Sequence, residues 1–239
     1  MKAQVTALGK CDIGQIYITD DGKTRIYIHL EEERKSPMLG ICPNGTVDID
    51  WGDGSEHDTL TGTSLTAIKH TNNHNYSHGG DYIIKLTVTG TAAIYGSSST
   101  NNNCRLLHQN IDADTRNRYY INSIVKVEIG NNIELYNYAF YTCYALKSIT
   151  IPNNTTNIYS YSFASCLALK YVTIPNNANT LISEYCFSNC YALKKIILSN
   201  NILTIGNSAF NSCYNLQDIL IPKNVQSIGA STFQYCYSF

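Results

Sequence analysis

Apolar residues fall into fixed columns along the second half of the chain. A phenylalanine and a cysteine three residues after it recur together, at Phe140/Cys143, Phe163/Cys166, Phe187/Cys190, Phe210/Cys213 and Phe233/Cys236. Successive copies are therefore 23, 24, 23 and 23 residues apart. A constant period in this range is typical of a stacked array of short structural repeats.

Further apolar positions stand at constant distances from each phenylalanine. An aliphatic residue lies five positions before it, at Leu135, Ile158, Ile182, Ile205 and Ile228. Six positions after it come Leu146, Leu169, Leu193, Leu216 and Phe239. Alternating apolar pairs then predict one short strand per copy, at Ile149/Ile151, Val172/Ile174, Ile196/Leu198 and Ile219/Ile221. We expect short turns around the phenylalanine, and a continuous core where the copies stack.

The repeat F-x-x-C-x-x-L-x-x-I-x-I-P resembles the BspA-like, or Treponema-type, leucine-rich repeats over residues 124–239, beginning with the incomplete copy Ile124-x-x-Val127-x-Ile129. The resemblance implies a solenoid on a surface protein, chiefly of bacteria, where members bind host matrix proteins or other cells. Similar arrangements also look like products of prophage regions, which implies a tail or receptor-binding role as an alternative.

The first third of the chain alternates with the period of two that is typical of strands. Strands are predicted at Gln15–Thr19, Thr24–Leu30, Thr46–Trp51 and Asp81–Gly90, with turn signals at Asp20-Asp21-Gly22 and Gly52-Asp53-Gly54. Several short strands separated by turns predict a small β-sandwich.

Three motifs in this region resemble the polycystic-kidney-disease (PKD) domain, an immunoglobulin-like sandwich. They are Val47-x-Ile49-Asp50-Trp51-Gly52-Asp53-Gly54, His74-x-Tyr76 and Gly80-x-Tyr82-x-Ile84-x-Leu86. The insert between Thr59 and Thr71 departs from the family pattern. The resemblance implies a spacer or contact module on an extracellular protein, without catalysis.

The predicted fold is mainly β, with a PKD-like sandwich at residues 1–92, a junction at 93–124 and leucine-rich repeats at 125–239. A Ser/Asn run at 96–103 indicates a loop within the junction. Because a solenoid exposes an apolar end that needs a cap, we expect Leu106, Leu107 and Ile111 to cover the first rung.

Composition and charge remove several classes of function. Net charge is −1 and charged residues make up 15% of the chain, which argues against binding to nucleic acid. The chain contains no run of 18 apolar residues, so we predict no membrane span within it. The first ten residues lack the apolar run of a secretory signal. We find no motif of a nucleophilic, phosphate-binding or metallo-enzyme site, and expect no catalysis and no cofactor.

Nine cysteines raise the question of disulfides. Equivalent Cβ atoms of stacked rungs stay ~4.8 Å apart, beyond the ~3.5–4.5 Å that a disulfide needs. The five array cysteines are therefore predicted to pack as small buried side chains, as is Cys186 in a column of small residues. A bridge among Cys11, Cys42 and Cys104 remains open.

Two groups of side chains have the composition of metal ligands, although we expect no metal. The carboxylates of Asp48, Asp50, Asp53, Glu56 and Asp58 could bind calcium, but the D-x-D-x-D-G spacing is broken, which favours a solvated strand and turn. On a strand, His70, His74 and His78 would span ~13 Å from end to end at ~3.3 Å per residue. We expect His74 and Tyr76 to brace the loop before the last strand.

Two surfaces of the array are candidate ligand sites. The outward strand positions predict two columns on the concave side: Lys126, Ser148, Tyr171, Lys195 and Asp218, and Glu128, Thr150, Thr173, Ile197 and Leu220. On the convex side stand Tyr138, Tyr161 and Tyr185, and Tyr144, Tyr191, Tyr214 and Tyr237. The alternatives are a merely solvated sheet and tyrosines that only cover the core edge.

These patterns predict a non-catalytic recognition module outside the cell. The leading hypothesis is a bacterial cell-surface adhesin that binds host protein or glycan through the repeat surface, with no nucleic-acid partner and no membrane insertion. The alternatives are a phage or prophage tail or receptor-binding protein, located on a virion, and a structural spacer. The oligomeric state stays open.

Overall fold

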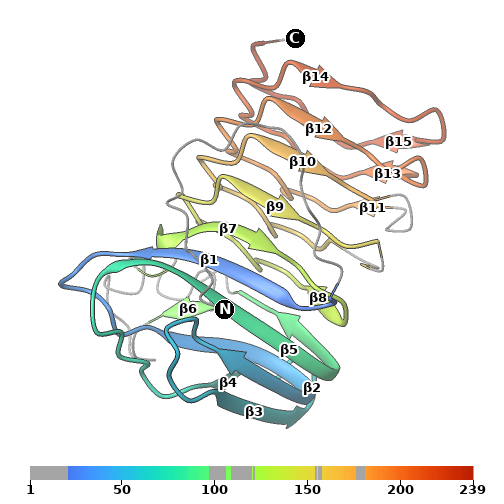
Figure 1. The fold of residues 1–239 in the computed structure, drawn as a ribbon. Coiled ribbons are helices and arrows are strands. Elements are labelled where there is room, and N and C mark those ends of the chain that lie inside the picture. Colours follow the sequence, from blue (N-terminus) through green and yellow to red (C-terminus); the bar gives the residue numbers. More distant parts are fainter. Residues whose placement is uncertain are drawn as a thin grey trace.

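The computed structural model describes residues 21–96, 106–108, 120, 122–153, 155, 158–175 and 181–238. Strands and turns dominate these residues, and parallel rungs are stacked on a group of longer strands (Figure 1). The predicted mainly β fold with a solenoid is therefore confirmed. The expected strand at Gln15–Thr19 and the positions Cys11, Cys104, Ile111 and Phe239 lie outside the described residues.

Among the described residues, six strands precede the solenoid, and four of them form an antiparallel sheet in the order β1-β5-β2-β3. Their bounds are β1 (Thr24–Leu30), β2 (Met38–Asp50), β3 (Asp58–Thr63), β4 (Lys69–His70), β5 (Gly80–Ile94) and β6 (Leu107–His108). The predicted alternation is confirmed, because Val47, Ile49 and Trp51 are at most 1% exposed whereas Asp48 and Asp50 face solvent in part. The immunoglobulin-like arrangement itself stays a prediction.

Strands β2 and β5 are longer than predicted because each changes partner along its length. The first residues of β2 pair with β4 and β6, and the rest pair with β5 and β3. Gly45 faces Gly90 across this ladder, and a Cβ on Gly45 would lie 2.1 Å from the carbonyl oxygen of Thr89. The φ value is +128° at Gly45 and +93° at Gly90, and glycine adopts such values freely. The two glycines thus allow the strands to approach closely there.

Two parallel ladders run along the solenoid. The first contains β7 (Ile124–Glu128), β9 (Ser148–Thr150), β10 (Tyr171–Thr173), β12 (Lys195–Ile197) and β14 (Asp218–Ile219). The second contains β8 (Ile133–Leu135), β11 (Leu181–Ile182), β13 (Thr204–Ile205) and β15 (Ser227–Ile228), with Ile158 bridging Leu135 to Ile182. The first ladder was predicted from the alternating pairs. The second was missed, since two residues per rung are too few for a periodic signal.

Beside the two ladders, the third wall of the solenoid consists of turns around each phenylalanine, as predicted, and we call it the turn wall. Two residues per rung have positive φ, one two positions before the phenylalanine and one two positions after it: Tyr138 and Thr142, Tyr161 and Ser165, Tyr185 and Asn189, Ser208 and Ser212, Ser231 and Tyr235. Residues with a Cβ rarely adopt this conformation. Hydrogen bonds between rungs stabilise it, since the N–H of Phe140, Phe163, Phe187 and Phe210 each donates to the next rung at 2.7–3.0 Å.

The repeat columns fill the space between these walls. Consecutive phenylalanine rings stack with centroids 5.2–5.6 Å apart, and the first four are fully buried. The predicted burial of the array cysteines is confirmed for Cys143, Cys166, Cys190 and Cys213, while Cys236 in the last rung is half-buried. Cys186 is buried too. Aromatic and sulfur side chains therefore form one column each along the solenoid.

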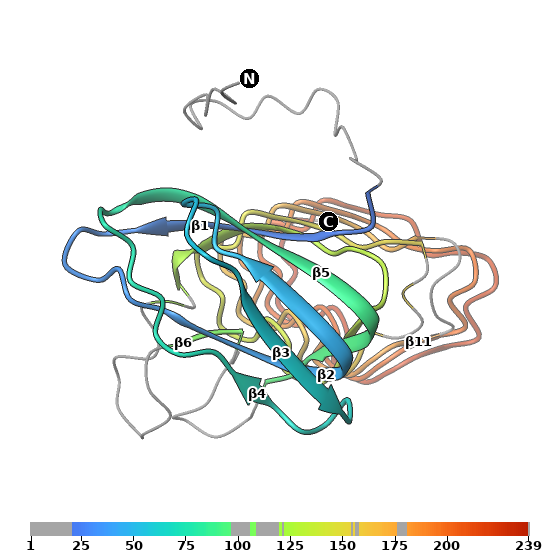
Figure 2. The same cartoon turned by 60° about the horizontal axis from the view of Figure 1, so that its bottom comes forward.

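The solenoid and the preceding strands share one sheet and one core. Strand β1 pairs antiparallel with β7, and the end of β5 pairs in parallel with β8 (Figures 1 and 2). The first rung therefore has a hydrogen-bonded neighbour on both ladders. Leu106 and Leu107 are buried in the same core, and β6 pairs with β2. The predicted domain boundaries at residues 92 and 124 remain a prediction.

Candidate functional site

Two columns of side chains project from the solvent-exposed face of the first ladder. The residues between them, such as Val172 and Ile196, are buried, so their neighbours face outward. Backbone register aligns the first column as Lys126, Ser148, Tyr171, Lys195 and Asp218, and the second as Glu128 with Thr150 and Thr173 with Ile197. The structure thus brings these predicted residues together in two straight rows. Their role in ligand binding stays a prediction.

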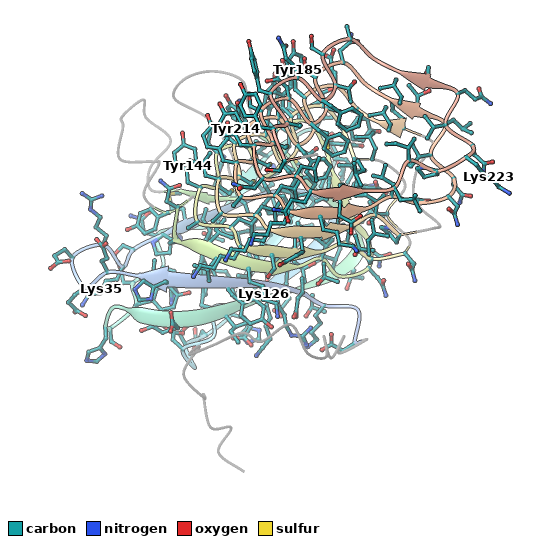
Figure 3. All side chains as sticks on the ribbon, turned by 90° about the horizontal axis from the view of Figure 1, so that it is seen from above. Lys35, Lys126, Tyr144, Tyr185, Tyr214 and Lys223 are labelled. Carbon is teal, nitrogen blue, oxygen red and sulfur yellow. The ribbon has the colours of Figure 1, made fainter. Side chains whose placement is uncertain are left out.

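The first rung carries a polar cluster that joins the solenoid to β1. The ammonium group of Lys126 lies 2.7 Å from a Glu128 carboxylate oxygen and 4.6 Å from the ring centroid of Tyr27. The Tyr27 hydroxyl donates to the other Glu128 oxygen at 3.1 Å. Partial burial, together with the nearby Glu128 charge, raises the pKa of Tyr27 to about 12. Lys126, which is labelled in Figure 3, and Glu128 are thus held by local partners.

The surface becomes more apolar toward β14. Tyr171 is 41% exposed, Ile197 51% and Leu220 83%. Lys195 and Asp218 lie beside them, joined by an ion pair of 2.7 Å that is open to solvent. Aromatic side chains are enriched in protein-binding surfaces, and exposed apolar side chains bordered by polar ones often mark them.

The tyrosines of the turn wall form two stacks. Tyr138, Tyr161 and Tyr185 stack with centroids 4.7–4.8 Å apart, and burial raises the pKa of Tyr161. Tyr191, Tyr214 and Tyr237 form the second stack at 4.8 and 5.8 Å, and they are 38%, 39% and 73% exposed. Tyr144 precedes this stack but is separated from it, because the next copy carries Leu167. The role of these tyrosines in ligand binding stays a prediction.

The exposed face of the first ladder continues onto the strands before the solenoid, which the sequence patterns did not predict. Arg25 and Tyr27 of β1 stand opposite Glu128 and Lys126 of β7. Ile83 of β5, which is 37% exposed, stands opposite Tyr27. One exposed sheet face therefore extends from β14 to β3.

The model of the "BspA type Leucine rich repeat region" matches residues 115–239 in six copies, more than half of the chain. The chain belongs to the BspA-type leucine-rich repeat family. This confirms the resemblance of the repeats, while the PKD-like character of the first strands remains a prediction.

Several solved structures are similar to this BspA-type chain. A leucine-rich cell surface protein from Faecalibacterium prausnitzii is 21% identical, with 64% of this chain and 51% of that one covered and a TM-score of 0.36. A leucine-rich repeat protein from Bacteroides ovatus is 18% identical, with 78% of this chain and 49% of that one covered and a TM-score of 0.43. The T. pallidum leucine-rich repeat protein is 22% identical, with 52% of this chain and 69% of that one covered and a TM-score of 0.34.

The chain spans about half the length of the first two of these structures. All three TM-scores are below 0.5, so the family assignment depends on the repeat pattern rather than on these likenesses. No curated protein sequence matches the chain.

The BspA-type rungs offer their cysteines no route to nucleophilic chemistry. Burial raises the pKa of the Cys186, Cys190 and Cys213 thiols, which disfavours the reactive thiolate. Within the described ranges, no cluster of three His, Cys, Asp or Glu side chains is placed to hold a metal ion. No helix in the described part of the chain is long and apolar enough to cross a membrane.

The acidic group of the first strands is engaged in contacts within the protein. Asp58 accepts a hydrogen bond from the Trp51 indole at 2.9 Å, and Asp48 lies 3.0 Å from His57. Asp50 accepts from Lys85 at 3.0 Å and from the N–H of Gly52 at 2.8 Å. These contacts hold a strand end and its turn, which is the alternative that the sequence favoured over calcium binding.

The predicted brace formed by His74 and Tyr76 is present, and it holds the turn after Trp51. The His74 ring stacks on Trp51 with centroids 4.4 Å apart, and its Nε2 lies 2.9 Å from Asp53. The Tyr76 hydroxyl donates to the Trp51 carbonyl at 2.9 Å. Although burial acts in the opposite direction, hydrogen bonds from Ser55 and His74 lower the pKa of Asp53.

One set of surface residues was overlooked in the sequence although its signal is plain. The residue after the core leucine is Lys147, Lys170 and Lys194 in three consecutive copies, and Gln217 in the next. All four are exposed. The recurrence of lysine at the same position in three consecutive copies is the signal that identifies this column in the sequence.

Proposed function

We propose that this BspA-type chain is a non-catalytic extracellular recognition module, a bacterial cell-surface adhesin that binds host protein or glycan. The binding surface is the exposed face of the first ladder. In this proposal the PKD-like strands in front of the solenoid act as a contact module that widens the same face.

One observation carries the proposal: the phenylalanine and cysteine columns of the core repeat one residue type, whereas the outward strand columns of the first ladder change it. Phenylalanine and cysteine recur in five copies, but the first outward strand column reads Lys126, Ser148, Tyr171, Lys195 and Asp218. A spacer needs only the buried columns. A varied row of side chains on a rigid sheet supplies a specific surface whose backbone does not have to be ordered on binding.

The experiment is a binding screen of the full chain against purified host matrix proteins and a glycan array. Tyr171→Ala removes an exposed aromatic ring from the centre of the face and should weaken binding to the partner at least tenfold, as for an interface hot spot. Tyr237→Ala, which changes a 73% exposed ring on the turn wall, is the matched control and should leave binding unchanged.

Two results would contradict this proposal. If Tyr237→Ala abolished binding and Tyr171→Ala did not, the turn wall and not the sheet would be the binding surface. If antibodies against the chain labelled purified phage particles and failed to label intact cells, the tail or receptor-binding alternative would replace the adhesin.

A further inference from the structure

A column of three lysines runs along the solenoid beside the exposed face. We call Lys147, Lys170 and Lys194 the lysine ladder. Backbone hydrogen bonds fix their register, because the N–H of Lys170 donates to the carbonyl of Lys147 at 3.4 Å and that of Lys194 to Lys170 at 2.9 Å. Stacked strands are ~4.8 Å apart. The backbone positions of the three lysines therefore lie one rung apart along the same edge of the solenoid.

The lysine ladder has no compensating acid among the described residues. All three side chains are exposed, and none takes part in an ion pair there. The neighbouring column behaves differently: Lys126 pairs with Glu128 and Lys195 pairs with Asp218. On the other side, the ladder is bordered by Ala145, Ala168 and Ala192 in the corresponding copies. The positive charge of the ladder is thus available to an external partner.

Holding three like charges in register is unfavourable for the protein alone. The chain as a whole is nearly neutral, with 17 Lys and Arg against 18 Asp and Glu. A row of cations on such a chain is a local concentration of charge that attracts a polyanion. The spacing of the row then selects among polyanions.

We propose that the lysine ladder binds an acidic polysaccharide lying along the solenoid axis. One sugar of an extended polysaccharide has about the length of one rung, and its carboxylates or sulfates project from more than one side of the chain, so several of them come within reach of the three long lysine side chains. An extended acidic peptide presents same-side groups only every ~6.6–6.8 Å, and duplex DNA has one phosphate per ~3.4 Å along each strand. Tyr171, in the next column and 41% exposed, adds an aromatic surface against which a sugar ring can pack. This inference rests on the proposed function and names the class of partner.

The test measures binding of the full chain to heparin and to polygalacturonate, with neutral dextran as the uncharged polymer. Replacing Lys170 and Lys194 by glutamine, the residue that the next copy carries at Gln217, should weaken polyanion binding at least about tenfold at physiological salt and reduce its salt dependence. Lys69→Gln with Lys223→Gln removes the same charge from exposed positions outside the ladder and should change binding little. Gln217→Lys lengthens the ladder and should tighten binding.

Equal losses in the two double variants, or no binding to either acidic polysaccharide, would overturn the inference. Polyglutamate or duplex DNA binding as tightly as the polysaccharides would overturn the choice of polysaccharide. If the full chain binds a host protein through Tyr171 but neither acidic polysaccharide, the adhesin proposal stands and the ladder inference fails. If nothing in either screen binds the full chain, both fail.

Discussion

From the second rung onward, the thiol of the array cysteine forms a hydrogen bond to the rung before it. The Sγ of Cys166, Cys190 and Cys213 donates to the carbonyl of the preceding rung's phenylalanine at 3.2 Å. That carbonyl also accepts the N–H of the cysteine in its own rung, as Phe163 does from Cys166 at 3.2 Å. The thiol thus supplies a second hydrogen bond to a buried carbonyl where the backbone supplies one. This explains a cysteine at a position whose packing alone an alanine or valine could satisfy.

Cys190→Ala removes both the sulfur volume and its hydrogen bond to Phe163. We expect a loss of ~1–2 kcal/mol in the free energy of unfolding, since a small cavity and one weak hydrogen bond are involved. Urea denaturation followed by circular dichroism measures it. Cys236→Ala is the control for burial, because Cys236 makes the same thiol contact, to the Phe210 carbonyl at 3.2 Å, in the half-buried last rung, and it should cost clearly less. Equal costs would show that burial does not govern this column.

Tyr27 makes stability fall at alkaline pH. Its pKa is raised to about 12, so the folded state keeps the proton over a range where the unfolded chain, with a tyrosine pKa of ~10, has lost it. The stabilisation is therefore complete below pH ~10 and is lost as the pH rises toward 12. Denaturation midpoints between pH 9 and 12 should fall less steeply in Tyr27→Phe than in the unchanged chain. Parallel curves for the two proteins would contradict this assignment.

At the scale of elements, the contact between β1 and the first rung depends on a close backbone approach at Gly130. A Cβ at this position would lie 2.3 Å from the carbonyl oxygen of Gly22, and the N–H of Gly130 donates to the Thr24 hydroxyl at 2.8 Å. The residue at position 130, in the connection between β7 and β8, therefore has to be small, since the backbone at the start of β1 passes directly over it.

Gly130→Ala should displace β1 from β7 and lower the free energy of unfolding by ~1–3 kcal/mol, as overpacking does. Chemical denaturation measures the loss. Gly54→Asn is a suitable control, because a Cβ there meets nothing within 4 Å and asparagine tolerates its φ of +83°. A smaller effect of Gly130→Ala than of the control would refute the close approach.

The elements also show which parts of the fold the sequence could predict. Strands β9, β10 and β12 follow from three alternating letters repeated at a constant period, and their outward residues fall where the alternation places them. The second ladder could not be predicted, since Thr204–Ile205 and its equivalents are too short for a period. The pairing of β1 with β7 joins residues about a hundred positions apart, as between Tyr27 and Lys126, and no local pattern specifies it. The lysine ladder, in contrast, follows from the sequence, because lysine recurs directly after the core leucine in three consecutive copies.

At the scale of the whole molecule, the strands before the solenoid act as its first layer. One core cluster includes Ile26 and Trp51 at one end and Leu216 at the other. Arrays whose units touch only their neighbours unfold unit by unit when contacts between units are weak. Here the first rung is paired on both ladders, through β1 and β5, so we expect the two parts to unfold together.

The single tryptophan makes this testable, because Trp51 reports only on the strands before the solenoid. Phe163→Ala in the second rung should lower the free energy of unfolding by ~3–5 kcal/mol, as for a buried phenylalanine. The most direct measurement is urea denaturation of this variant, followed by Trp51 fluorescence and by far-ultraviolet circular dichroism. Our account predicts that both transitions move to the same lower urea concentration. A Trp51 transition that stays in place while the circular dichroism transition moves would contradict it.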